Sequence, residues 1–338
     1  MTEAAETRGS AVGRVGGRKR QVFLAVGGLF WTWLLARWAY HNTLLDGLLT
    51  AVGLPDVLRS DLGVSQREPW LPADWFAGVA ANLATDAGGV SVLVVDPLVW
   101  LFELAALAAE SEPALAAGAF LTVYLTVLSM FFGLFIAVPA AVTRIYGGPI
   151  SSRISLAYTE LIRGTPLLAQ LFFFYFGLPL AGFISGFRVM EVSGMPRAAA
   201  VVAIVAFTIN SSAYQAEYIR AALQSVDPGQ LTAARSVGLS RLQGIRHVVL
   251  PQGLRYAIPG WTNEFVYLLK YSSLAAFITV PELFRRARNI GSDTFQFTDI
   301  YLIVGLLYLA LVITTAMLMN RLERRVTIPG VGMPAGRD

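Results

Sequence analysis

The sequence predicts an all-α, polytopic integral membrane protein. Its 338 residues are 55% apolar with a mean hydropathy of +0.59. Apolar segments about 20 residues long recur along the chain, which is the length that a helix needs to cross a hydrocarbon core of about 30 Å. No water is available in the hydrocarbon core, so the backbone N–H and C=O groups of a spanning segment must bond to each other. A helix meets this requirement within the segment itself. Basic residues lie in short stretches between these segments, as is typical of cytoplasmic loops.

We expect about six transmembrane helices, the last five forming a permease-like core within residues 115–320. The candidate spans are 22–40, 115–142, 154–184, 198–221, 256–280 and 299–319. Segment 22–40 is too long for a cleaved signal peptide and is predicted to remain as the first transmembrane helix. Arg14, Arg18, Lys19 and Arg20 precede it, so residues 1–21 are expected to be a cytoplasmic tail.

This count assigns a side of the membrane to each connecting segment. The loop 222–255 and the tail 321–338 are expected in the cytoplasm, and the insert 41–114 outside. The positive-inside pattern holds for these segments. Arg285, Arg286 and Arg288 are the exception, because they fall on the outer side.

The insert 41–114 is rich in proline and tryptophan, which indicates turns near a membrane interface. Its apolar run 90–109 contains Asp96, Pro97 and Glu103, which weaken it as a span. We therefore expect a docked, non-spanning helix there. A spanning helix is the alternative, and it would move loop 222–255 outside unless another span compensated.

Composition excludes several classes of function. The sequence has no cysteine and two histidines, so disulfides, iron–sulfur sites and cysteine-based zinc sites are excluded, and no metal or cofactor is expected. Its only lysines, Lys19 and Lys270, do not follow a glycine, so there is no GxxxxGK[ST] phosphate loop. No catalytic constellation is visible. We predict a protein that is not an enzyme, and its dispersed basic residues do not indicate nucleic acid.

The cytoplasmic loop is predicted to fold as two short helices. Asp227 can cap a helix that has Pro228 at its first position and runs to Val237, and Gly238 is placed to end it. A second helix from Ser240 to Val249 is expected to stop before Pro251. Such a pair makes a compact knob that can enter a cleft on a partner protein. The alternative is an ordinary amphipathic loop at the membrane surface.

The spacing within this loop resembles a family signature. Thr232-Ala233-Ala234, then Gly238, then Val248-x-Leu250-Pro251 is similar to the EAA loop of permease subunits of binding-protein-dependent ABC importers. The stretches 157–179, 210–220 and 269–274 resemble the polar amino-acid subfamily. Thr232 departs from the pattern, which has a glutamate there.

The resemblance implies a function and partners. The chain would be the permease subunit of an ATP-driven importer, translocating polar or charged amino acids across the plasma membrane of a prokaryote. It would work with ABC ATPase subunits, a second permease subunit, an extracytoplasmic substrate-binding protein and membrane lipid. The residues implied in coupling to the ATPase are Thr232, Ala233, Ala234, Arg235, Gly238, Leu250 and Pro251.

Ionisable residues within the apolar spans are costly and mark candidate substrate contacts. Glu160 and Arg163 are three residues apart and can pair on one helix face, as can Glu217 and Arg220. Pro166 is expected to kink the helix that follows the first pair. Lys270 lies deep in the span 256–280.

We predict a substrate path along Lys270, Tyr271, Ser272 and Ser273 with Glu160 and Arg163. The alternative for Lys270 is an ion pair with Glu264, Glu160 or Glu217. Two other functions stay open at this point. A secondary transporter or channel working alone would show an inverted repeat, which we do not find between 115–221 and 256–319. A membrane scaffold is the third.

Overall fold

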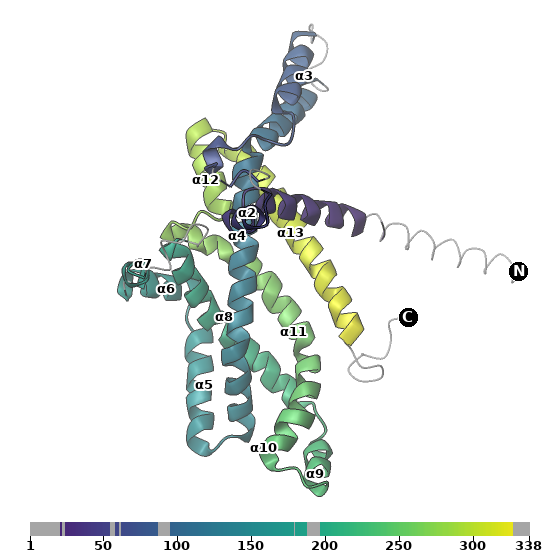
Figure 1. Ribbon diagram of the computed structural model, residues 1–338, viewed down its shortest axis with the longest axis vertical. Coiled ribbons are helices and arrows are strands. Elements are labelled where there is room, and N and C mark those ends of the chain that lie inside the picture. The colour runs from purple at the N-terminus through teal and green to yellow at the C-terminus, as the bar shows by residue number, and fades with distance from the viewer. Residues whose placement is uncertain are drawn as a thin grey trace, which may run out of the picture. The chain divides into compact units, whose positions relative to one another are not determined.

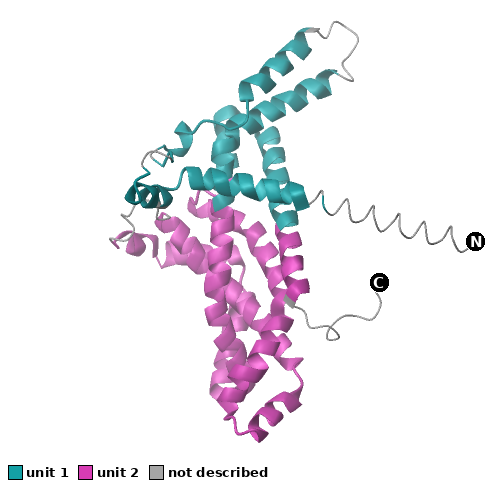
Figure 2. Ribbon diagram, turned by 45° about the vertical axis from the view of Figure 1, so that its right-hand side comes forward, with its two compact units in different colours: residues 1–120, 286–314 teal, residues 121–285, 315–338 magenta. Residues whose placement is uncertain are grey.

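The computed structural model describes residues 21, 24–54, 58–60, 62–86, 95–178, 180–187 and 197–326. All regular secondary structure within these ranges is helical, which confirms the all-α prediction (Figure 1). The chain divides into two compact units (Figure 2). Unit 1 comprises Met1–Phe120 and Arg286–Thr314, and unit 2 comprises Leu121–Arg285 and Thr315–Asp338.

Three of the described helices are long and apolar enough to cross a membrane. They are α4 (Val95–Tyr146), α8 (Ala198–Gln224) and α13 (Phe297–Val326). Each contains one predicted span, namely 115–142, 198–221 and 299–319. Residues 24–40 are also helical, in agreement with the predicted first span, whose residues 22 and 23 lie outside the described ranges.

Unit 1 holds the described part of the insert, with α2 (Thr43–Ala51), η1 (Val64–Gln66) and α3 (Ala73–Asp86). A buried ion pair anchors it: Arg37 Nη2 lies 3.1 Å from Glu112 Oε2. Glu112 also accepts hydrogen bonds from the Trp33 indole (3.2 Å) and the Trp70 backbone (3.4 Å). The Arg37 guanidinium lies 4.8 Å from the centre of the Trp70 ring. These contacts hold the segment around Trp70 against two helices.

The predicted docked, non-spanning helix over 90–109 is helical in its described part, but it is not set apart from the next span. Residues 95–109 are the first turns of α4, which continues without interruption into the predicted span 115–142. Alanine, leucine and glutamate, all strong helix formers, dominate the joining stretch. At 1.5 Å per residue, the 52 residues of α4 extend for about 78 Å, more than twice the hydrocarbon core. Because one continuous helix crosses a bilayer once, 95–109 cannot add a reversing span.

The predicted span 154–184 is not one helix. It consists of α5 (Pro149–Arg163), α6 (Leu167–Phe172), the π-helical turn η2 (Phe173–Gly177) and α7 (Leu180–Ser185). The chain breaks at Gly164–Pro166 instead of kinking. Pro166 lacks a backbone donor and disfavours a helical Thr165, so α5 ends before it.

The predicted span 256–280 combines α11 (Leu250–Tyr271) with the 3₁₀ helix η5 (Ser272–Ile278). The next helix is α12 (Leu283–Thr294). Helix α8 is central to unit 2 and packs against α5, α6, α7 and α11. Two glycines let α11 approach α8 closely. A Cβ atom at Gly260 would lie 2.7 Å from the Tyr218 ring, and one at Gly253 would lie 2.5 Å from the Leu223 side chain.

Candidate functional site

The loop between α8 and α11 folds as the sequence predicts over most of its length. Asp227 accepts a hydrogen bond from the Gly229 backbone (2.7 Å) and caps α9 (Pro228–Ser236). Gly238 follows this helix with a φ of 90°, a left-handed conformation that glycine adopts without strain. Ser240 then caps α10 (Arg241–Gly244) in a reciprocal pair with Gln243. Both helix starts and the glycine stop are confirmed.

The second helix does not stop before Pro251, as the sequence analysis expects. It continues through the π-helical turn η4 (Ile245–Val249) directly into α11. Pro251 is the second residue of α11, so it lies inside this continuous helical stretch and offers no backbone donor to the turn before it. The second half of the loop, from Arg241 onward, and the predicted span 256–280 are therefore parts of one continuous helix, which we call the helical rod.

The two loop helices pack on each other through a small inner face and expose an apolar tip. Ala234 is buried, and a Cβ atom added at Gly244 would lie 2.8 Å from Leu231 and 3.3 Å from Ala234. Val237 and Leu242 are 78% and 72% exposed. Of the residues implied in coupling, the exposed ones are Thr232, Ala233, Arg235, Gly238 and Pro251, and Leu250 is half-buried.

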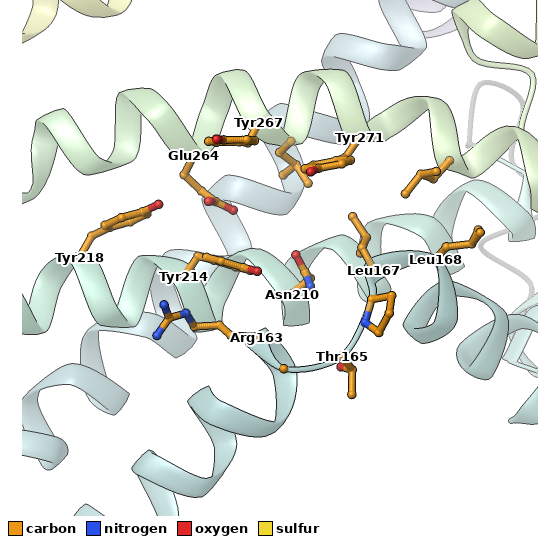
Figure 3. Close-up of a pocket in the computed structure, with 14 residues that line it drawn as sticks. Arg163, Thr165, Leu167, Leu168, Asn210, Tyr214, Tyr218, Glu264, Tyr267 and Tyr271 are labelled. Atoms are coloured by element: carbon orange, nitrogen blue, oxygen red, sulfur yellow. The ribbon is translucent and has the colours of Figure 1, made fainter.

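A second feature of unit 2 is a cavity of about 740 Å³ at the break between α5 and α6 (Figure 3). Its walls come from three places in the sequence: the break itself, the middle of α8 and the second half of α11. The lining residues are Arg163, Gly164, Thr165, Pro166, Leu167, Leu168, Asn210, Tyr214, Tyr218, Glu264, Tyr267, Leu268, Tyr271 and Leu274.

The Gln170 side chain bridges the break between α5 and α6 by hydrogen bonds on the side that faces the core. Its amide nitrogen lies 2.7 Å from the Ile162 carbonyl oxygen and 3.1 Å from that of Thr165. Its amide oxygen accepts a hydrogen bond from Asn210 of α8 (3.1 Å). Gln170 is buried and adds a side-chain donor to both carbonyl oxygens at the helix break, of which that of Ile162 also accepts from the Thr165 backbone (3.4 Å).

Glu264 is the buried ionisable residue of the cavity wall, with 5% of its surface exposed. Its carboxyl group points into the space between α8 and α11, where the tyrosines stand around it (Figure 3). Arg163 lies on the same cavity wall as Tyr214: its guanidinium carbon is 5.4 Å from the centre of that ring.

The structure brings together only part of the predicted substrate path. Arg163 and Tyr271 line the cavity, whereas Glu160, Lys270, Ser272 and Ser273 do not. Ser272 is buried, and its hydroxyl donates to the Leu269 carbonyl oxygen (2.7 Å).

The ion pairs offered as the alternative for Lys270 do not form among the described residues. Glu160 lies 4.0 Å from Arg163, and Glu217 pairs with Arg220. The Lys270 ammonium is exposed and lies 4.9 Å from the centre of the Tyr267 ring.

The sequence marks Glu264 only as a possible partner for Lys270, and it does not single out Tyr214, Tyr218 and Tyr267 as part of a site. A signal was present. Tyr214 and Tyr218 are four residues apart, and Glu264, Tyr267 and Tyr271 follow a spacing of three and four, so each set shares one helix face. The sequence does not indicate that these faces of α8 and α11 pack against each other.

Comparison with known proteins agrees with the fold. Residues 129–328 match the family described as "binding-protein-dependent transport system inner membrane component". The glutamine transport system permease protein GlnP of Escherichia coli (strain K12) is 38% identical over 216 residues, which are 64% of this chain and 94% of that protein. The probable amino-acid ABC transporter permease protein YckA of Bacillus subtilis (strain 168) is 37% identical over 219 residues, covering 65% and 92%.

Solved structures give the same picture. A crystal structure of an amino acid ABC transporter with histidines has a chain that is 34% identical, with a TM-score of 0.54, and the match covers 63% of this chain and 94% of that one. A chain of the inward-facing MetNI methionine ABC transporter is 24% identical with a TM-score of 0.53, which shows the shared fold.

Proposed function

The chain belongs to the family of inner membrane components of binding-protein-dependent transport systems, and on that basis we propose that it is the permease subunit of an ATP-driven importer of polar or charged amino acids. Its relatives GlnP and YckA are named as permeases for glutamine and for amino acids. The match begins at residue 129, so most of unit 1 lies outside the similarity that supports this proposal.

The observation that carries the proposal is the helical rod formed by the cytoplasmic loop and α11. Exposed Val237 and Leu242 give the loop an apolar tip, and Arg235, Arg241 and Arg246 surround it with exposed positive charge. An apolar centre with a charged rim is the composition of a protein docking site. An ATPase subunit seated on this tip would push directly on the helix that carries Glu264.

The remaining partners follow from the same function. The sequence lacks a phosphate-binding loop, so separate ATPase subunits would hydrolyse ATP. A second permease subunit would complete the path, and an extracytoplasmic binding protein would deliver the amino acid. The location would be the plasma membrane of a prokaryote. Thr232, where the family pattern has glutamate, would contact the ATPase through a hydroxyl instead of a carboxylate.

Cysteine labelling tests the docking directly, because the sequence contains no cysteine of its own. In inside-out vesicles, Val237→Cys is expected to react with a membrane-impermeant maleimide, and addition of the ATPase subunit should protect it. Arg324→Cys, in the last turn of α13, is the matched control and should react equally with and without the ATPase. Labelling of Val237→Cys only from the outside of intact cells would refute the proposal.

Transport is the second test. The permease, its ATPase and its binding protein reconstituted in vesicles should take up labelled amino acids only when ATP is present. Gly238→Arg, at the turn between the two loop helices, should abolish this uptake, because a φ of 90° is strained for a residue with a side chain and the new charge would lie beside the apolar tip. Uptake without ATP would favour a secondary transporter.

A further inference from the structure

The described part of the insert carries an exposed apolar face built by α3 and the first turns of α4. These helices are neighbours within unit 1 (Figure 2), and the Trp75 and Phe102 rings meet edge to face with their centres 6.2 Å apart. Leu98, Leu101 and Phe102 follow the spacing of one helix face. Trp75 is 58% exposed and Leu101 is 51% exposed. We call Trp75, Leu98, Leu101 and Phe102 the insert face.

Two contacts fix the insert face to the rest of unit 1. The buried ion pair between Arg37 and Glu112 joins α4 to the helix over residues 24–40. Close to the insert face, the Trp100 indole donates a hydrogen bond to the Asp299 carboxylate at the start of α13 (3.0 Å). A surface that is already held in place loses little freedom when a partner binds, which favours association.

The charge around the insert face has one sign. All charged residues from Glu68 to Glu112 are acidic. Asp74, Asp96 and Glu103 are exposed on the two helices, and none of the ion pairs among the described residues includes them. An aromatic centre with a charged rim is the composition of a protein docking site, and a rim of one sign selects a partner of the opposite sign.

The position and the charge of the insert face argue against two other occupants. Leu101 and Leu98 lie 14 and 17 residues before the predicted span 115–142, which is about 21–26 Å of helix, whereas each headgroup layer of a bilayer is about 5–8 Å thick. Contact with lipid would require α4 to bend at Pro113. A second copy of the chain would bring one acidic rim against another, which is repulsive.

We propose that the insert face is a docking surface for an extracytoplasmic protein with a basic contact surface, and that in the importer proposed above this protein is the substrate-binding protein. The family match begins at residue 129, so the insert face is an addition to the shared transport core. It raises the affinity for the binding protein, and the core carries out transport. This inference rests on the proposed import function and on the predicted outside location of 41–114, and it adds the docking surface.

Protection from labelling tests the insert face, because the sequence contains no cysteine of its own. In right-side-out vesicles with the permease–ATPase complex, Leu101→Cys is expected to react with a membrane-impermeant maleimide, and purified binding protein should protect it. Leu48→Cys, exposed on α2 of the same insert, is the matched control and should react equally with and without the binding protein. Full reactivity of Leu101→Cys in the presence of binding protein overturns the proposal. Reactivity that appears only after detergent is added also overturns it, because lipid would then cover the face.

The dissociation constant of the binding protein is the second measurement. Combining Asp74→Asn, Asp96→Asn and Glu103→Gln should weaken binding about five-fold at low salt and flatten its dependence on ionic strength. Trp75→Ser should weaken binding about ten-fold. Asp293→Asn, exposed on α12, is the charge control and should bind as the unchanged protein does. Unchanged affinity of the neutralised rim and of Trp75→Ser overturns the proposal.

The outcomes separate the two proposals. At saturating binding protein, the neutralised rim should keep the maximal rate of ATP-driven uptake, because the transport core is intact. ATP-driven uptake without protection or a change in affinity overturns the docking surface and leaves the import function standing. A rim variant that changes the number of subunits in the complex at unchanged affinity assigns the face to a second copy and overturns the proposal. No ATP-driven uptake by the complete transporter overturns the import function, and the docking surface with it.

Discussion

Replacing Gln170 with leucine should weaken the fold at the break between α5 and α6. The substitution keeps the approximate volume of the side chain but removes its hydrogen bonds. The carbonyl oxygens of Ile162 and Thr165 lose a donor, and the Asn210 amide loses an acceptor. Gln170 and Asn210 are both buried, so water does not readily replace the bond between them.

The expected loss of stability follows from three hydrogen bonds, because the two amide hydrogens of Gln170 are shared among the Ile162 carbonyl and the carbonyl and hydroxyl of Thr165, and its oxygen accepts from Asn210. A hydrogen bond contributes about 1 kcal/mol in a soluble protein and about 0.6 kcal/mol between membrane helices, so three are worth about 2–3 kcal/mol. For a domain of this size, 1 kcal/mol corresponds to about 2–4 °C. Gln170→Leu should therefore lower the midpoint of thermal unfolding in detergent by about 4–12 °C.

A thermal-shift assay on the purified protein measures this, with Gln296→Leu as the matched control at an exposed position of the chain. The control should unfold within about 1 °C of the unchanged protein, because surface substitutions seldom exceed 0.5 kcal/mol. A double variant with Asn210→Leu should lose less than the sum of the two single losses, since both remove the same bond. Strict additivity, or an unchanged midpoint for Gln170→Leu, would show that the break does not depend on this side chain.

Three further changes test other parts of the structure. Gly238→Val should reduce ATP-dependent uptake and lower the free energy of unfolding by about 1–2 kcal/mol, because its φ of 90° is unfavourable for a residue with a side chain. Gly148→Val is the control, since Gly148 has open space and an ordinary φ, and it should leave uptake unchanged. Equal uptake by the two variants would contradict the reasoning. Gly260→Val should lower the midpoint of unfolding by an overpacking cost of about 1–3 kcal/mol against Tyr218, while Gly305→Val, which meets nothing within 4 Å, leaves it unchanged. Arg37→Met should cost about 3–5 kcal/mol by leaving Glu112 buried without its partner, seen as faster proteolysis between residues 52 and 72. Adding Glu112→Met should restore much of that resistance, and a single variant as resistant as the unchanged protein would argue against the anchor.

The sequence predicts the helical class and the helix starts of loop 222–255 well because their signals are local. Hydropathy and length identify α8 and α13, and Asp227, Gly238 and Ser240 act on their immediate neighbours. The break at Pro166 is local too, yet the sequence predicts only a kink. The difference is Gln170, which satisfies the freed carbonyls and lets the helix end completely.

The cavity was harder to predict because it depends on contacts between distant segments. Lys270 is conspicuous as a rare lysine in an apolar span, but the turn of α11 directs it away from the lining. Glu264 lies six residues earlier, on the face where Gly253 and Gly260 bring α11 against α8. Glu264 is buried because these two helices pack against each other, and this burial cannot be read from the sequence.

The π-helical turn at Ile245–Val249 joins α10 to α11 without an intervening loop, so the tip at Leu242 and Glu264 lie on one continuous helical stretch. From Arg241 to Tyr271 the backbone stays helical, and Pro251, Pro259 and the π-helical turn are the places along it where the helix can bend. If the proposed ATPase binds at the tip, a push there would become tilt or rotation of α11 on the side of the bends nearer the cavity. Energy released by a nucleotide-driven partner would thereby reach the cargo as mechanical work on a single carboxylate.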